Sequence, residues 1–247
     1  MNARAFAGCL ALTLGIAAPA PAQDYPGVPV LMYHKVNAVV PRDAVGRDLT
    51  VTPDRFEAQL RYLREHGIRT ITAAQLAQSL ARGERPAHAV VLTFDDGYDD
   101  AATTALPLLK KYGAVGTFYV SAGFVGTPRH LDWKQIRALA AAGSEVACHG
   151  TFHRDLTTLD AAGQRFEAGH CVQTFGRYLA RFKAVTYAYP AGQYDATTVA
   201  TLRRLGIIAA FTEHPGVVRS LTAAYELPRR RIRHDDDVAA FAALATP

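Results

Sequence analysis

Short apolar runs alternate with amphipathic segments along most of the chain. An apolar run of four to eight residues between turn residues is typical of a buried strand. This pattern predicts strands over residues 28–36, 89–94, 116–121, 144–150, 184–190 and 207–212. The segments between them combine polar caps with apolar residues three and four positions apart, which predicts helices. These helices cover residues 52–67, a stretch ending near 111, 132–143, about 160–182, 195–206 and a last stretch opening at 235–237.

The segment over residues 52–67 illustrates how the helix signals agree. Thr52 is a good N-cap because its hydroxyl can accept a bond from a free backbone N–H, and Pro53 suits the first helical position. Gly67 permits the left-handed conformation that ends many helices. Asp195 plays the same capping role for residues 195–206. Both helices are therefore predicted with defined starts.

Six or seven strands separated by helices argue for one α/β domain built on a parallel sheet. At 247 residues the chain can bury one substantial core, and a (β/α) barrel, distorted or incomplete, is favoured over an open sheet. Catalytic groups of such barrels lie at the carboxyl ends of the strands. His34, the pair Asp95–Asp96, His149 and the segment after Tyr189 all follow predicted strands. We expect them to meet on one rim.

The first 23 residues have the features of a secretory signal peptide. One basic residue, Arg4, precedes an apolar run over residues 5–18, and small residues lead to a cleavage point after Ala22 or Gln23. The run is too short and too rich in alanine for a transmembrane span. The prediction is a signal peptide over residues 1–23 and a mature domain over 24–247, working in a bacterial periplasm or secreted, without stable membrane insertion.

Removal of that segment would leave two cysteines, Cys148 and Cys171. An oxidising compartment permits a disulfide between them. A disulfide also requires close α-carbons, which spacing along the chain does not reveal. Two independent small buried residues explain the pattern as well, so the sequence leaves the pairing open.

Composition and charge exclude one class of partner. Hydrophobic residues make up 49% and charged residues 20% of the chain, as in ordinary globular proteins. The formal charge of +5 comes from scattered arginines, apart from a run around Arg229–Arg231. Without a basic stripe or interleaved aromatic residues, nucleic-acid binding is not expected. We interpret residues 229–233 as a solvated strand edge.

The stretch VVLTFDDGYDD, residues 90–100, places Asp95 beside Asp96 at the end of a strand. Two close carboxylates repel each other unless a cation or a shared proton relieves them. Downstream, His149 and His153 lie four residues apart just past another strand. Two neutral imidazoles and one carboxylate form a common set of ligands for a catalytic divalent ion, with positions left for water and substrate. Without such an ion, the aspartates would only cap a turn that Gly97 allows.

These residues resemble the motifs of the polysaccharide deacetylase family, the NodB-type enzymes of carbohydrate esterase family 4. TFDDG is followed by HGTFH, which has Gly where the family pattern H-[ST]-x-x-H has Ser or Thr. The resemblance extends from about residue 28 to 241. It implies a distorted (β/α) barrel with Asp96, His149 and His153 as metal ligands and Asp95 as general base. The ligand set suits zinc first, and also cobalt, nickel or iron.

Further motifs are similar to the poly-β-1,6-N-acetyl-D-glucosamine N-deacetylases of biofilm systems. These motifs are LMYHKV, RFEAQLRYLREHGIRTIT and YAYPAGQYD. The resemblance implies His34 as general acid, although His214 in FTEHPG is an alternative. The family's motif arginine falls at Ala188 and its tyrosine at Ala191. Because the arginine that usually steadies the base is missing there, another group must orient Asp95.

The implied activity is metal-dependent hydrolysis of N-acetyl groups, that is, of linear amide C–N bonds, in an N-acetylglucosamine polysaccharide. Poly-β-1,6-N-acetylglucosamine is the expected substrate; peptidoglycan or chitin-type β-1,4 chains are the alternative, and an inactive carbohydrate-binding homologue is an alternative of another class. The Ala191 N–H is expected to stabilise the oxyanion, and exopolysaccharide export machinery is a candidate partner. Substrate contacts are expected from Tyr189, Pro190, Ala191 and Trp133.

Overall fold

The structure is a computed structural model, and it describes residues 25–247. The predicted signal peptide lies outside the described residues. Among the residues that the structure describes, no helix is long and apolar enough to cross a membrane. The strands are β1 (Val28–Tyr33), β2 (Lys35–Val36), β3 (Thr50–Val51), β4 (Arg69–Ile71), β5 (Ala89–Phe94), β6 (Thr117–Val120), β7 (Glu145–Cys148), β8 (Thr186–Ala188), β9 (Ala209–Phe211), β10 (Val217–Val218) and β11 (Arg230–Arg231).

The helices are α1 (Ala44–Asp48), α2 (Pro53–Glu65), α3 (Ala73–Ala81), α4 (Leu106–Tyr112), α5 (Trp133–Ala141), α6 (Ala161–Tyr178), α7 (Ala196–Arg204) and α8 (Val238–Ala245). A π-helical turn, η1 (Ala101–Ala105), leads into α4, and three 3₁₀ turns are η2 (Ala122–Phe124), η3 (Leu156–Thr158) and η4 (Pro190–Gly192). The side chains of Thr52 and Asp195 cap α2 and α7 as predicted, and Asp237 caps α8.

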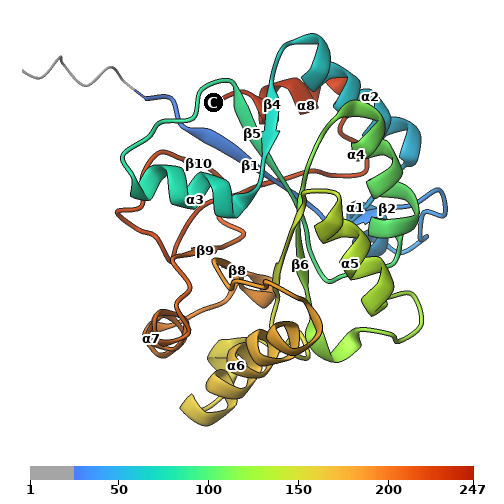
Figure 1. The fold of residues 1–247 in the computed structure, drawn as a ribbon. Helices are drawn as coiled ribbons and strands as arrows, with labels where there is room; N and C mark the ends of the chain where they lie inside the picture. The colour runs from blue at the N-terminus through green and yellow to red at the C-terminus, as the bar shows by residue number, and fades with distance from the viewer. Residues whose placement is uncertain (1–24) are drawn as a thin grey trace, which may run out of the picture.

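The main sheet curls into an incomplete barrel (Figure 1). Its strands follow the order β10-β1-β5-β6-β7-β8-β9, all parallel except β10 against β1. The segment over residues 227–231 links the two sides of the sheet. Leu227 bonds to β9, and β11 runs parallel to β1. The predicted distorted or incomplete (β/α) barrel is therefore confirmed, with all its catalytic-end loops on one rim.

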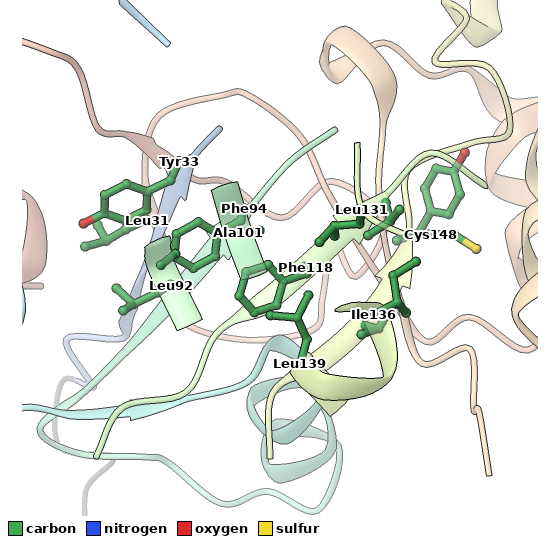
Figure 2. Close-up of a cluster of buried hydrophobic side chains, with 14 of the residues drawn as sticks. Leu31, Tyr33, Leu92, Phe94, Ala101, Phe118, Leu131, Ile136, Leu139 and Cys148 are labelled. Atoms are coloured by element: carbon green, nitrogen blue, oxygen red, sulfur yellow. The ribbon is translucent and has the colours of Figure 1, made fainter. Parts of the chain in front are cut away.

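Side chains alternate between two cores because successive residues of a strand point to opposite faces. Leu31, Leu92 and Phe118 belong to the core under the helices. In Figure 2 the rings of Tyr33, Phe94 and Phe118 lie in a row, with centroids 5.2 and 4.7 Å apart. Their neighbours in sequence fill a second cluster on the other face, together with α3. The core therefore fixes the strand ends that carry the polar residues.

The strand predicted over residues 28–36 is interrupted at His34. β1 ends at Tyr33, and Lys35–Val36 pair instead with Thr50–Val51 in a separate two-stranded sheet. This break leaves His34 between two strands that belong to different sheets. It places the imidazole at the rim of the barrel rather than within its wall.

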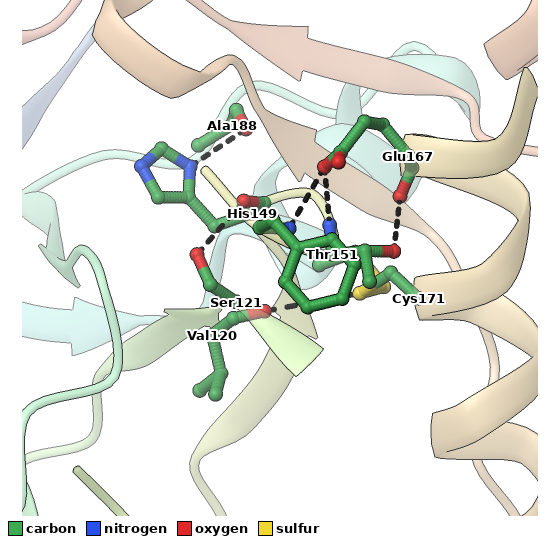
Figure 3. Close-up of a disulfide and its surroundings, with 9 residues drawn as sticks. Val120, Ser121, His149, Thr151, Glu167, Cys171 and Ala188 are labelled. Atoms are coloured by element: carbon green, nitrogen blue, oxygen red, sulfur yellow. Dashed lines mark hydrogen bonds between the residues drawn. A yellow bond between two sulfur atoms is a disulfide. The ribbon is translucent and has the colours of Figure 1, made fainter. Parts of the chain in front are cut away.

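Cys148 and Cys171 form a disulfide, which settles the pairing that the sequence left open. Their α-carbons are 6.0 Å apart, and both residues are buried. The bond joins the end of β7 to the middle of α6, and Figure 3 shows it beneath the loop that begins at His149. The helix is thereby tied covalently to the strand that carries a candidate site residue.

We expect the double variant Cys148→Ala/Cys171→Ala to lose about 2–4 kcal/mol of unfolding free energy, because the open chain has a larger unfolded ensemble. Urea unfolding of both proteins at equal metal content measures the difference. Reduced wild-type protein is the control and should match the variant. Equal midpoints for oxidised wild type and variant would contradict the prediction.

Candidate active site

The two aspartates lie on a sharp turn at the end of β5. The Asp95 N–H donates to the Tyr33 carbonyl (3.0 Å), which continues the pairing of β5 with β1. Asp96 and Gly97 then adopt φ values of 73° and 84°. A Cβ on Gly97 would lie 2.6 Å from Val120 Cγ1, so only glycine fits. The turn sends the two neighbouring carboxylates to different surroundings.

The two predicted histidines converge on Asp96. The Nε2 atoms of His149 and His153 lie 3.4 and 3.2 Å from Asp96 Oδ1. His149 Nδ1 is 2.8 Å from the Ala188 carbonyl, as Figure 3 shows. A carbonyl only accepts, so Nδ1 carries the proton and Nε2 keeps its lone pair for a ligand. Three strand ends, those of β5, β7 and β8, thus build this group.

The donor set fits a divalent metal ion. The three side chains each offer one atom, and these atoms lie within 4.8 Å of one another. Asp96 Oδ1 is buried and no donor reaches it with hydrogen-bond geometry, which is costly unless a cation satisfies it. Burial raises the pKa of Asp96, but the imidazoles of His149, His153 and His34 outweigh it and hold that pKa well below the usual value. An ionised carboxylate and two imidazoles are what such an ion needs.

Backbone strain gathers at this site. Asp96, His153 and Ala191 all have positive φ values, of 73°, 53° and 53°. Residues with a Cβ disfavour this region, so the fold holds them there at a cost. Such outliers are typical of positions that are fixed for function.

Helix α6 holds the histidine loop through Glu167, a residue that the sequence analysis did not single out. Its buried carboxylate accepts bonds from the N–H groups of Thr151 (2.8 Å) and Phe152 (2.9 Å). The Thr151 hydroxyl donates to the Glu167 carbonyl (2.8 Å), as drawn in Figure 3. Together with the disulfide, these bonds fix the loop between the two histidines.

Arg229 supplies the missing arginine. Its guanidinium donates to both oxygens of Asp95, at 2.8 and 2.7 Å, and its Nε donates to the Thr212 carbonyl at 2.9 Å. Arg229 is 1% exposed, so for this residue the interpretation of residues 229–233 as a solvated edge is wrong. Side-chain alternation along β5 turns Asp95 inward, and Arg229 enters from the segment that joins β9 to β11. This chain has Ala188 where the family's motif has its arginine, and Arg229, much later in the chain, contacts Asp95 instead.

Electrostatics keep Asp95 ionised. Burial raises its pKa, but Arg229 and the imidazoles of His149 and His34 outweigh that effect, so the pKa lies below the usual value. His34 is buried beside both aspartates, and burial lowers its pKa even though the two carboxylates oppose the shift. His214, the other candidate acid, is exposed, and its carbonyl accepts from the Arg229 N–H at 2.9 Å.

The structure locates the four predicted substrate-binding residues in three environments. Ala191 is exposed on the rim, within η4 and three residues after the end of β8. Tyr189 and Pro190 are buried, and the Tyr189 hydroxyl donates to the Tyr225 carbonyl (3.0 Å), so the Tyr189 side chain faces the core. Trp133 stacks on Tyr178, with ring centroids 4.5 Å apart, in the contact between α5 and α6. Only the backbone of Tyr189 is therefore placed to contact a substrate. The substrate-binding role of Trp133 stays a prediction.

Comparison with known proteins gives consistent relatives. YxkH of Bacillus subtilis (strain 168), provisionally named a polysaccharide deacetylase, is 29% identical over 217 residues, covering 87% of this chain and 75% of that protein. A poly-β-1,6-N-acetyl-D-glucosamine N-deacetylase of Staphylococcus aureus (strain MSSA476) is 24% identical over 202 residues, covering 76% of this chain and 70% of that protein. The solved deacetylase PplD of Streptococcus pyogenes, in complex with acetate, has a TM-score of 0.83 at 28% identity, covering 90% of this chain and 99% of PplD.

The family model for polysaccharide deacetylases matches residues 82–210. This stretch runs from before β5 to within β9, so it includes the Asp96, His149 and His153 group and excludes both His34 and Arg229. The site geometry, the barrel and the matched half of the sequence agree, and the chain belongs to the polysaccharide deacetylase family.

Proposed function

We propose that the protein is a secreted, metal-dependent hydrolase that removes N-acetyl groups from poly-β-1,6-N-acetylglucosamine. The observation that carries the proposal is the buried, unsatisfied Oδ1 of Asp96 between two imidazole Nε2 atoms. The similarity to the Staphylococcus aureus enzyme and the histidine beside β1 support the β-1,6 substrate. Periplasmic or secreted localisation is proposed from the sequence of residues 1–23, and the disulfide is in keeping with it.

Asp96, His149 and His153 would hold the metal ion in this proposal. A divalent ion bound there would supply Lewis acidity, which polarises an amide carbonyl and lowers the pKa of bound water towards about 7. Asp95 accepts the proton of the attacking water, because its carboxylate is ionised and lies off the ligand group. Arg229 holds both Asp95 oxygens and so fixes the direction of the remaining lone pairs.

The collapse of the tetrahedral intermediate needs an acid, because an amine leaves poorly unless it is protonated. His34 is the proposed donor of that proton, from its position between β1 and β2. The Ala191 N–H is proposed to donate to the oxyanion, and a donor of this kind is worth about 3 kcal/mol in the transition state. The products are acetate and a free glucosamine unit.

The test of the substrate is acetate release from defined N-acetylglucosamine oligomers with β-1,6 and β-1,4 linkages. We expect the metal-loaded protein to deacetylate the β-1,6 series faster. Faster release from the β-1,4 series would reassign the enzyme to peptidoglycan or chitin-type chains. Oligomer binding without turnover in metal-loaded protein would indicate an inactive carbohydrate-binding homologue.

We expect His153→Ala to lose its bound metal ion, since one of three ligands is removed from a site that has no spare protein donor in the group. Metal content after dialysis, measured by mass spectrometry, checks the result. His66→Ala is the matched control, because the His66 ring lies against Tyr62 on α2 with centroids 3.9 Å apart. A stoichiometric ion in the His153 variant, or full turnover after chelation, would refute the assigned ligand set.

A further inference from the structure

Six aromatic rings form a continuous strip along the rim of the barrel. In spatial order the aromatic strip consists of Tyr98, His130, Phe124, Phe152, Phe166 and His170. Each ring centroid lies 5.0–6.4 Å from the next. The rings come from the loops after β5, β6 and β7 and from α6, so the strip crosses several strand ends.

The strip is open to solvent. Phe152 is 47% and Phe166 is 50% exposed, and both are large apolar side chains. His170 is exposed, and the other three rings are partly exposed. A contiguous exposed apolar surface is unusual in a monomeric protein and marks a place where something binds.

The strip adjoins the candidate metal site directly. Tyr98 lies two residues after Asp96, and Phe152 immediately precedes His153. Between these two points the strip passes through His130 and Phe124, and beyond Phe152 it continues to Phe166 and His170. A molecule lying along it would pass the metal ligands and extend beyond them.

The Tyr98 end of the strip is also polar. A cavity of about 410 Å³ opens there beside Tyr98 and His130, and its charged and polar lining consists of Lys35, Asn37, Asp99, Asp100 and Arg129. Lys35 Nζ lies 4.4 Å from the centre of the Tyr98 ring. Hydrogen-bonding groups around an aromatic ring suit a sugar, which presents an apolar face of C–H groups and an edge of hydroxyl and amide groups.

The central ring is held rigidly. A Cβ on Gly123 would lie 2.4 Å from Phe152 Cε1, so the ring packs on the bare glycine backbone. The Phe152 N–H donates to the Glu167 carboxylate at 2.9 Å, and the Gly123 N–H donates to the Thr151 carbonyl at 2.8 Å. A ring fixed in this way can receive a ligand with little loss of side-chain entropy.

We propose that the aromatic strip binds the sugar units that neighbour the unit that is deacetylated, on the side of Phe166 and His170, so that the enzyme acts on units within a polymer. The proposal rests on the proposed function, because it takes the metal site as the point of reaction. Tyr98 and His130 at one end, His170 at the other and the charged side chains of the cavity offer hydrogen-bonding groups at both ends of the strip, which favours a carbohydrate over a lipid surface. The strip therefore makes chain length a determinant of turnover.

The test uses Phe166→Ala in the full-length, metal-loaded enzyme. Phe166 lies on the exposed face of α6, away from the ligand group, so the variant should fold and keep its metal. We expect kcat/KM for a β-1,6-linked hexamer to fall about three- to tenfold, as for the loss of one aromatic contact, with no change for the dimer. Val238→Ala is the control: this apolar residue is 42% exposed on α8, outside the strip and outside the Trp133 contact. It should change neither value.

Calorimetric binding of the hexamer gives a readout that does not depend on turnover. Weaker hexamer binding by the Phe166 variant would support the strip whether or not the wild-type protein releases acetate. Absence of acetate release from the wild type would contradict only the proposed function. Equal losses for dimer and hexamer, or the same loss in the Val238 variant, would overturn the strip. The strip would also be overturned if the Phe166 variant bound the hexamer as the wild type does but no longer sedimented with phosphatidylglycerol vesicles. That result would assign the strip to a membrane surface.

Discussion

Replacing Asp95 with asparagine is expected to lower kcat for acetate release by about 10²–10⁴-fold, the usual contribution of a general base. The amide keeps the shape of the side chain but cannot accept the proton of the attacking water. The effect should appear across the neutral range, because the pKa of Asp95 lies below its usual value and the carboxylate is already ionised there. Steady-state acetate release from β-1,6 oligomers measures the loss.

Metal content separates the role of Asp95 from that of its neighbour. The Asn variant should retain its ion, because Asp96 and the two histidines supply the ligand atoms. Asp160→Asn is a suitable control, since Asp160 caps α6 and asparagine caps helices equally well. Full activity in the Asp95 variant, or loss of the ion from it, would show that the base has been misassigned.

Most of the candidate site could be predicted from the sequence because its parts are local. Asp95, Asp96 and His149 each follow an apolar run, and a parallel sheet brings such strand ends to one edge. His153 needs only the spacing of four from His149. The buried Oδ1 of Asp96 and the positive φ of His153 refine this prediction without changing its members.

Arg229 could not be predicted in the same way, because its partner lies 134 residues away. The segment LPRRRIR has three adjacent arginines, and nothing in its pattern distinguishes the buried one from its neighbours. In the structure Arg230 and Arg231 are partly exposed, whereas Arg229 is buried and its guanidinium donates to Asp95. The indirect signal was the alanine at position 188, because without an arginine there another group had to orient Asp95.

Helix α3 and the disulfide show two other limits. The α3 segment AAQLAQSLA was not predicted, although Thr72 and Gln75 form a capping box at its start. The disulfide depends on the distance between β7 and α6, which is a property of the packed fold. Local patterns define elements and loops, but contacts between distant segments need the tertiary structure.

Arg229→Met is expected to lower the free energy of unfolding by about 3–5 kcal/mol, because it leaves the Asp95 carboxylate buried without its partner. In the wild type the lowered pKa of Asp95 stabilises the fold above the unfolded pKa, and this contribution is lost as pH falls through the folded pKa. In the Arg229→Met variant the burial of Asp95 is opposed by fewer positive charges, so Asp95 takes up a proton more readily. The loss of unfolding free energy relative to the wild type should therefore shrink toward pH 4. Urea unfolding of metal-free protein at several pH values measures it.

The double variant Asp95→Leu/Arg229→Met separates stability from catalysis. Replacing a buried ion pair with apolar residues of similar volume is often neutral or stabilising, so the double variant should unfold at higher urea than Arg229→Met alone. It should nevertheless release no more acetate than Asp95→Asn, because no base remains. A double variant that stays as unstable as the single one would indicate that Arg229 supports the fold through Thr212 and Thr93 instead. Recovery of stability in the double variant would show that the fold does not need the Arg229–Asp95 pair, which is in keeping with the proposed role of the guanidinium in orienting Asp95 for the reaction.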